Sequence, residues 1–523
     1  MSCDQNAPWW RGAVIYQIYP LSFADSNGDG WGDLGGVLDH LDHVASLGVD
    51  AVWLSPFFRS PMRDFGYDVS CHTEVDPLFG TIADADAVIA KAHRLGLKIV
   101  LDQVWSHTSD QHPWFKASAS RLDGKEDWYV WADPRPDGTP PNNWLSVFGG
   151  SAWSWEPRRR QYYLHHFLSS QPKLNLRNPA ALDAILATGR FWLERGVDGF
   201  RLDAVDFMAH DPALRDNPAL PPPGGMIPLK PFGLQRHDHD MLHPDALDIM
   251  RRIRALTDEF PGTMTLAEIS SQPGAFGRIA DYARADHLHL GYTLRLLRGD
   301  FSAASLEDAL REAAAAVDGG AMCWAFGNHD VVRVATRWAR GDRTAQHALM
   351  MLLGSLPGAV CLYQGDELGL PEAELTHDQL RDPFGITYWP EFAGRDGSRT
   401  PMPWHALAPH AGFTEGTPWL PVPEAHRALS ADRQEHDPRS ALHGWREFLR
   451  WRKTVPALVQ GRLGAVWREG DMLGFERVLG DTRLLCVFNL SPLPGRFGED
   501  QAELPGWGTA FIPLSGDAES VAA

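Results

Sequence analysis

Charged residues stand close together in a segment that is otherwise apolar. The stretch Gly199-Phe200-Arg201-Leu202-Asp203 is short and apolar, as a buried strand is. Side chains alternate between the two faces of a strand, so Arg201 and Asp203 point the same way. The guanidinium favours the ionised form of Asp203, which could then act as a nucleophile or a charge stabiliser. The alternative at this point is a structural ion pair.

Similar groups end other apolar segments of the chain. They are Asp102, His107, Glu268, His329 and Asp330. Packing does not explain so many ionisable groups at strand ends, because each of them loses hydration there. Asp203 and Glu268 therefore predict a pair of carboxylates on neighbouring strands.

A carboxylate pair without a phosphate-binding loop or a catalytic cysteine or serine motif indicates glycoside hydrolysis. Asp203 would attack the anomeric carbon of a sugar. Glu268 lies between Ala267 and Ile269 and is less solvated, so it would stay protonated and deliver a proton to the leaving oxygen.

Strand-like and helix-like segments alternate along most of the chain and must position these groups. We expect strands at residues 14–19, 51–55, 98–105, 199–205, 264–269, 287–292, 322–326 and 359–363. This order favours a closed parallel (β/α)8 barrel, or TIM barrel, over an open doubly wound sheet. In such a barrel the strand ends meet on the face where active sites are built.

Irregular segments and a change of pattern divide the chain into four parts. Residues 1–106 and 178–457 are predicted to form the barrel, and residues 107–177 an insertion domain after the third strand. From residue 458 to 523, short apolar alternations separated by turn residues predict an antiparallel β domain.

Composition limits the partners of the protein. A chain of 523 residues with a net charge of -19 does not suit nucleic acid, whose phosphates attract basic surfaces. No apolar run reaches membrane-spanning length, and the first residues lack the features of a signal peptide. We expect a cytoplasmic protein without a membrane or nucleic-acid partner. The sequence leaves open whether the protein forms homo-oligomers.

The motifs together resemble the α-amylase family of retaining glycoside hydrolases, and within it the α-glucosidase and oligo-1,6-glucosidase branch. They are Asp102-Gln103-Val104-Trp105-Ser106-His107, Gly199-Phe200-Arg201-Leu202-Asp203, Ala267-Glu268 and Phe326-Gly327-Asn328-His329-Asp330. The resemblance implies that Asp203 is the nucleophile and Glu268 the acid/base. Asp330 would bind ring hydroxyls and help to distort the sugar.

The resemblance also implies a pocket for one terminal glucose. The residues expected to form it are Asp64, Tyr67, His107, Phe167, Arg201, His329 and Arg399. Tyr67 would stack on the sugar, and Arg399 would reach it together with Asp64. A pocket sealed by Asp64 and Arg399 admits only a chain end, so the enzyme should act from the non-reducing terminus. Small maltose-like α-glucosides are the expected substrates.

A separate segment carries oxygen ligands at alternate positions and a glycine at the sixth, as the start of a calcium loop does. Similar α-glucosidases hold Ca²⁺ or Mg²⁺ as a structural ion there. The corresponding ligands are Asp25, Asn27, Asp29, the carbonyl of Trp31, and Asp33. The alternative is an Asn/Gly turn that ends in a helix cap.

Three positions bear on the exact activity. Ser106 replaces an asparagine of the amylase calcium site, and Lys173 stands where the oligo-1,6-glucosidase branch has aspartate. Ala204 follows the predicted nucleophile. In the branch that the chain resembles, valine stands there in α-1,6-acting enzymes and a smaller or polar residue in α-1,4-acting ones, so the resemblance implies α-1,4 bonds. Transfer of glucose to another hydroxyl is an expected activity beside hydrolysis. A sucrose or trehalose isomerase, a glucosyltransferase and, more remotely, a non-catalytic scaffold of the same fold are the alternatives.

Overall fold

Eight parallel strands form the centre of the molecule. The computed structural model describes residues 7–222, 229–270, 274–299, 301–317, 321–498 and 501–514. The strands run in the order β11-β10-β9-β5-β2-β1-β13-β12. Their bounds are β1 Val14–Ile18, β2 Ala51–Leu54, β5 Lys98–Gln103, β9 Gly199–Leu202, β10 Met264–Ile269, β11 Leu290–Thr293, β12 Cys323–Ala325 and β13 Ala359–Tyr363. A parallel bridge between Gly291 and Met322 joins the two edge strands, so the sheet closes and the predicted barrel is confirmed.

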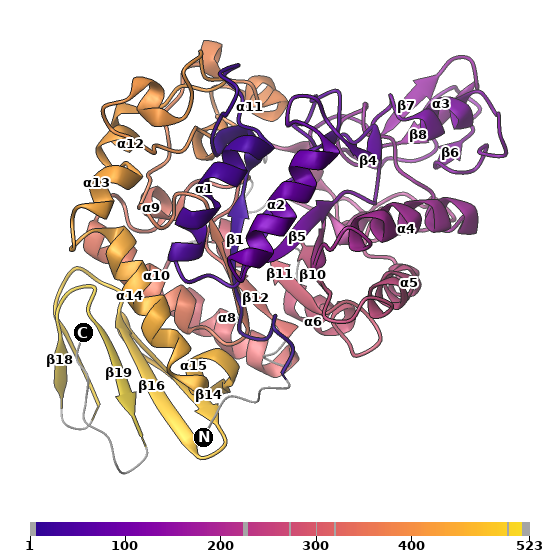
Figure 1. Ribbon diagram of the computed structural model, residues 1–523. Coiled ribbons are helices and arrows are strands. Elements are labelled where there is room, and N and C mark those ends of the chain that lie inside the picture. The colour runs from indigo at the N-terminus through magenta and orange to yellow at the C-terminus, as the bar shows by residue number, and fades with distance from the viewer. Residues whose placement is uncertain are drawn as a thin grey trace.

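A helix follows each barrel strand and packs outside it (Figure 1). These helices are α1 Leu34–Ser46, α2 Ile82–Arg94, α4 Pro179–Leu193, α5 Ala246–Asp258, α6 Ala275–Tyr282, α8 Ala303–Ala316, α10 Arg343–Ser355 and α14 Ala441–Lys453. Several begin at a side-chain cap that accepts an otherwise unpaired backbone N–H. Thr81, for example, forms a reciprocal capping box with Asp84 at the start of α2.

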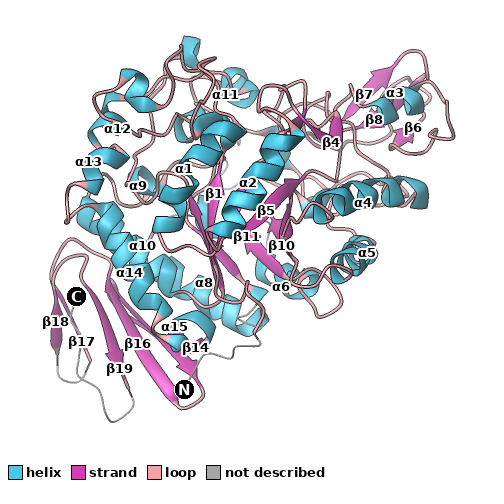
Figure 2. Cartoon of the chain, in the orientation of Figure 1, coloured by secondary structure: helices cyan, strands magenta, loops and turns pink. Residues whose placement is uncertain are grey.

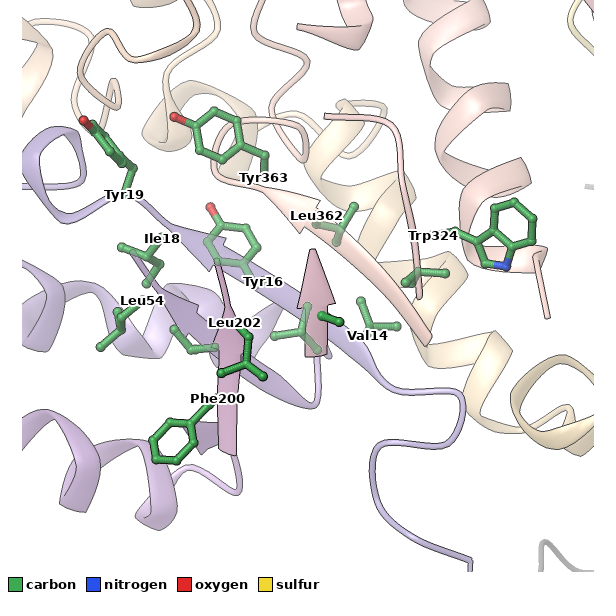
Figure 3. Close-up of a cluster of buried hydrophobic side chains, with 14 of the residues drawn as sticks. Val14, Tyr16, Ile18, Tyr19, Leu54, Phe200, Leu202, Trp324, Leu362 and Tyr363 are labelled. Carbon is green, nitrogen blue, oxygen red and sulfur yellow. The ribbon is translucent and has the colours of Figure 1, made fainter. Parts of the chain in front are cut away.

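Alternate residues of the barrel strands pack into two separate clusters. Tyr16, Phe200 and Leu202 point outward into the layer between the strands and the helices, where Figure 3 shows them. Trp53 and Leu266 belong to a second cluster inside the barrel. Because side chains alternate between the two faces of a strand, Arg201 lies on the inner face, opposite to Phe200 and Leu202, as the sequence predicts.

The strand before the predicted nucleophile is shorter than expected. Strand β9 ends at Leu202 and not at residue 205, because Ala204 adopts a left-handed conformation with φ 47°. The chain then turns into the short helix η2, Val205–Phe207. Asp203 therefore lies directly after the last residue of the strand and before the turn.

Two smaller sheets lie at opposite ends of the molecule (Figure 1). Between β5 and α4 the chain forms α3 Pro113–Ala119 and the sheet of β6 Trp131–Ala132, β8 Gln161–Leu164 and β7 Trp153–Glu156. The C-terminal sheet is antiparallel and contains β14 Arg462–Glu469, β15 Met472–Leu479, β16 Thr482–Asn489 and β19 Thr509–Pro513. The predicted antiparallel sheet is therefore confirmed, while the predicted domain boundaries stay predictions.

The remaining elements are short and lie mostly in the excursions between strands and helices, which Figure 2 draws as long pink loops. They are β3 Phe58–Arg59, β4 Cys71–Val75, α7 Arg295–Arg298, α9 Val334–Arg337, α11 Pro383–Tyr388, α12 Glu424–Ala428, α13 Ala431–Glu435, α15 Pro456–Gln460, β17 Gly495–Phe497 and β18 Ala502–Leu504, with η1 Pro20–Ser22, η4 Pro231–Leu234, η6 His377–Gln379, η7 Asp396–Ser398 and η8 Pro409–Gly412. Among the described residues, no helix combines the length and the apolar character needed to cross a bilayer.

Candidate active site

A cavity of about 490 Å³ collects the side chains that follow the barrel strands. Predicted site residues that line it are Asp64, Tyr67, His107, Phe167, Asp203, Glu268 and Asp330. Arg201, His329 and Arg399 lie behind them and are fully buried or nearly so. The structure therefore brings the residues of the predicted glucose pocket to one place.

The guanidinium of Arg201 joins the carboxylates of three neighbouring strands. Its Nη1 lies 2.9 Å from Oδ1 of Asp203 and 2.8 Å from Oδ1 of Asp102, and its Nη2 lies 2.8 Å from Oε2 of Glu268. Nη2 also donates to the hydroxyl of Tyr292 at 2.9 Å. One buried cation thus holds Asp203 and Glu268 close together on adjacent strands.

Burial acts on the pKa values of two aspartates in this cluster. It raises the pKa of Asp203 well above its ordinary value, the charge of Arg201 opposes this rise, and the charges of Glu268 and Asp102 add to it. Burial also raises the pKa of Asp102 to about 6, again against the charge of Arg201. The charge of Arg201 thus acts to keep Asp203 ionised, as the sequence predicts, and burial acts against it.

Asp330 is held ionised by its own set of cations. Its Oδ1 accepts hydrogen bonds from Nη2 of Arg399 at 2.7 Å and Nη1 of Arg395 at 3.4 Å. Although burial acts to raise it, His329 and these two guanidinium groups hold the pKa of Asp330 well below its ordinary value. An ionised carboxylate in this place can accept hydrogen bonds from sugar hydroxyls.

The partner of Asp64 differs from the predicted one. Nη2 of Arg395, not Arg399, lies 2.8 Å from Oδ1 of Asp64, and the same guanidinium lies 2.8 Å from Asp382. The turn of η7 separates the two arginines and directs Arg399 to Asp330 and to the carbonyl of His329. The prediction that Arg399 closes the pocket with Asp64 is therefore corrected to Arg395.

Arg395 and Gln171 line the cavity and were not predicted from the sequence, nor was Asp382, which is buried and binds Arg395. Gln171 donates from Nε2 to Oδ2 of Asp64 at 2.9 Å and to the carbonyl of Tyr67 at 3.2 Å. The sequence does contain a signal for Arg395, because a second arginine stands four residues before Arg399 in the same loop. Nothing in the local pattern distinguishes Gln171 from an ordinary loop glutamine.

The two predicted histidines are neutral hydrogen-bonding groups. Burial lowers the pKa of His107 and of His329 to about 3. Gln17 Nε2 lies 2.7 Å from Nδ1 of His329, so Nδ1 accepts and Nε2–H faces Asp330 at 3.5 Å. The ring of Tyr67 stacks on His329 with centroids 5.2 Å apart, and its hydroxyl donates to Asp102 at 2.9 Å. Phe167 lies beside His107, with centroids 5.2 Å apart.

The predicted metal loop is held by its own hydrogen bonds. Oδ1 of Asp25 accepts the N–H groups of Asn27 and Gly28, and Asn27 and Asp29 each accept an N–H two residues further on. Asp33 accepts from Gly36 and caps helix α1, as the alternative interpretation predicts. Within the described ranges, no group of three or more acidic, histidine or cysteine side chains is placed to hold a metal ion. The calcium or magnesium ion stays a prediction.

Comparison with known proteins agrees with this geometry. The model of the protein family described as alpha amylase, catalytic domain, matches residues 17–461. A probable alpha-glucosidase of Rhizobium meliloti (strain 1021) is 50% identical over 98% of both chains, and an oligo-1,6-glucosidase of Heyndrickxia coagulans is 34% identical over 92% of both. The crystal structure of an alpha-glucosyl transfer enzyme, 49% identical, superposes with a TM-score of 0.94 over 97% of this chain and 100% of that one. The chain belongs to the α-amylase family, as a glycoside hydrolase of its α-glucosidase and oligo-1,6-glucosidase branch.

Proposed function

We propose that the enzyme releases a terminal glucose from short α-glucosides with retention of configuration, through a covalent glucosyl ester on Asp203. The observation that carries the proposal is the shared guanidinium, because Arg201 contacts both Asp203 and Glu268. Carboxylates held so close favour the retaining geometry, with a separation of about 5–5.5 Å, over the wider spacing of inverting enzymes.

In the first step, Oδ of Asp203 attacks the anomeric carbon while Glu268 gives its proton to the glycosidic oxygen, so the bond to the leaving group breaks. In the second step, Glu268 takes a proton from water, whose oxygen attacks the same carbon and frees the Asp203 carboxylate. Three carboxylates share the charge of Arg201, which favours keeping one proton in the cluster for the first step. Asp330 accepts hydrogen bonds from ring hydroxyls as positive charge develops on the sugar.

The far end of the cavity supports action on chain ends. The ion pair of Asp64 and Arg395 is buried and lies beside Tyr67 and Gln171 on the cavity wall. A glucose chain could not continue through this wall, so one terminal residue would be bound. Ala204 lines the cavity with a methyl group only, which supports α-1,4 bonds as in maltose. A cytoplasmic location belongs to the same proposal.

Glucosyl transfer is the second candidate. The glucosyl ester can react with any hydroxyl that replaces water, and the structurally similar protein that is 49% identical is an alpha-glucosyl transfer enzyme. The outer cavity also has an apolar wall that includes Phe232, Phe384 and Phe392. Such a wall holds an acceptor ring and leaves less room for water.

A time course of products from maltose, isomaltose, trehalose and sucrose tests both candidates. We expect glucose from maltose as the first product, with oligosaccharides appearing at high maltose if transfer competes. Proton NMR before mutarotation should show the α anomer. A β anomer would mean inversion, and an isomer of sucrose as the main product would place the enzyme among the isomerases.

A further inference from the structure

The cavity is lined by two cations, Lys230 and Arg298, that form no ion pair with any residue in the described ranges. Nζ of Lys230 lies 3.9 Å from the ring centre of Phe384 and 4.3 Å from that of Phe392. Arg298, at the end of α7, is exposed and lines the same cavity. Over the residues that the structure describes, neither side chain forms an ion pair or a hydrogen bond.

The carboxylates whose charges act on Lys230 are already paired with other cations. Asp330 and Asp382, whose charges act on Lys230, are bound by Arg399 and Arg395. Burial lowers the pKa of Lys230 to about 8, and the charge of Arg298 acts in the same direction. Two neighbouring cations therefore repel each other across the cavity, which is an unfavourable arrangement in the free enzyme.

A third cation adds to the positive wall. Arg337 lines the cavity and donates to the carbonyls of Phe326, Leu296 and Gly299. It is fixed in place and meets no carboxylate within ion-pair distance among the described residues. The floor of the cavity has the opposite character, because Asp203, Glu268 and Asp330 lie there. A neutral sugar suits the floor, and an anionic group suits the outer wall.

We propose that Lys230 and Arg298 bind a negatively charged group, a carboxylate or a phosphate ester, on the part of the substrate or acceptor that is not the transferred glucose. The proposal rests on the proposed glucosidase function and names the class of leaving group that the enzyme prefers. The phenyl rings beside Lys230 offer flat apolar faces without donors, so the two cations supply the recognition of charge.

A matched pair of substrates tests the proposal. One is the α-glucoside of 4-hydroxybenzoate, and the other is the α-glucoside of its methyl ester, which has nearly the same size and no charge. An α-glucosyl-glucose with a 6-phosphate on the leaving sugar, compared with maltose, distinguishes a phosphate from a carboxylate. The measured quantity is kcat/KM for the charged substrate divided by kcat/KM for its neutral partner.

The wild-type enzyme should prefer one of the charged substrates. Lys230→Met and Arg298→Gln should each reduce the preference by about tenfold, as expected for a charge-assisted hydrogen bond. Lys125→Met is the control, because Lys125 also lies over an aromatic ring, that of Trp128 at 4.5 Å, but outside the cavity. It should leave the preference unchanged.

The proposal would be overturned if this ratio of kcat/KM values were the same in the wild type and in both variants. The glucosidase function would remain intact, since the neutral substrate is still cleaved. If neither partner of a pair is cleaved, the glucosidase function itself fails, and this proposal fails with it. Lys230→Glu gives a second check, because reversing the charge should turn the preference toward the neutral ester.

Discussion

The backbone N–H of Ala204 donates a hydrogen bond of 3.0 Å to Oε2 of Glu268. The residue that follows the predicted nucleophile therefore holds the predicted acid/base. Ala204 reaches this position through a left-handed backbone conformation, which costs about 1–3 kcal/mol for a residue other than glycine. The surrounding barrel must stabilise that turn, and the two carboxylates are placed by the same short segment of backbone.

Asp203→Asn should lower turnover of maltose by several orders of magnitude, because an amide cannot form the glucosyl ester. The fold should persist, and the melting temperature should stay the same or rise, since burial raises the pKa of the Asp203 carboxyl and its ionised form is unfavourable there. Steady-state kinetics and thermal unfolding measure the two effects.

Asp206→Asn is the matched control for that variant. Asp206 is another buried carboxylate at the cavity, but it pairs with Ser270 and not with Arg201. It should keep most of the turnover. Near-wild-type activity of Asp203→Asn would remove Asp203 as the nucleophile.

The acidic limb of the pH profile should lie above the ordinary pKa of an aspartate, because burial raises the pKa of Asp203 and the ionised form is the reactive one. Asp102→Asn removes a negative charge that acts to raise this pKa and leaves more of the charge of Arg201 to Asp203. The limb should therefore move to lower pH. A plot of kcat/KM against pH for both proteins measures the shift, and a move to higher pH would contradict the assigned cause.

Much of the fold was predictable from the sequence, because hydrophobic periodicity and strand–helix order are local properties. The strands at 264–269 and 359–363 match the structure. The predicted strand at 199–205 is too long because Ala204 and Val205 continue the apolar pattern, and an alanine gives no sign of a left-handed turn. Arg395 was missed for a related reason: which of two arginines reaches Asp64 depends on how the loop around η7 folds, and spacing does not encode that.

Arg395 should prove to be the partner of Asp64 in solution. In a double-mutant cycle on kcat/KM for maltose, Asp64→Asn and Arg395→Lys should show a coupling energy of about 0.5–3 kcal/mol, as residues in direct contact do. Asp64→Asn and Arg399→Lys should couple less, because Arg399 binds Asp330 instead. Stronger coupling of Asp64 with Arg399 would restore the original prediction.

Chelation tests the predicted Ca²⁺ or Mg²⁺ at the loop that begins with Asp25. An ion that binds only the folded protein adds to its stability, so EDTA should lower the melting temperature and either ion should restore it. The loop also contacts the chain after β13, because Thr414 donates from Oγ1 to Asp25. Asp25→Ala should be less stable and insensitive to EDTA. A wild-type melting temperature that EDTA does not change would exclude a stabilising ion in this loop.

Lys173 should make folding stability depend on pH in the neutral to alkaline range. Its ammonium group is buried against the carbonyls of Phe207 and Met208, and burial lowers its pKa to about 7. Between this value and the ordinary pKa of about 10.4, the unfolded chain binds more protons than the folded one, so stability rises with pH.

The difference in unfolding free energy between the wild type and Lys173→Met isolates the contribution of this one ammonium group. Between pH 7 and pH 9, denaturant titrations should show the wild type gaining about 2 kcal/mol of unfolding free energy relative to the variant. Lys116→Met, at an exposed lysine of α3, is the control and should follow the wild type. Equal slopes in wild type and Lys173→Met would mean that the buried ammonium keeps an ordinary pKa, satisfied by the two carbonyls alone.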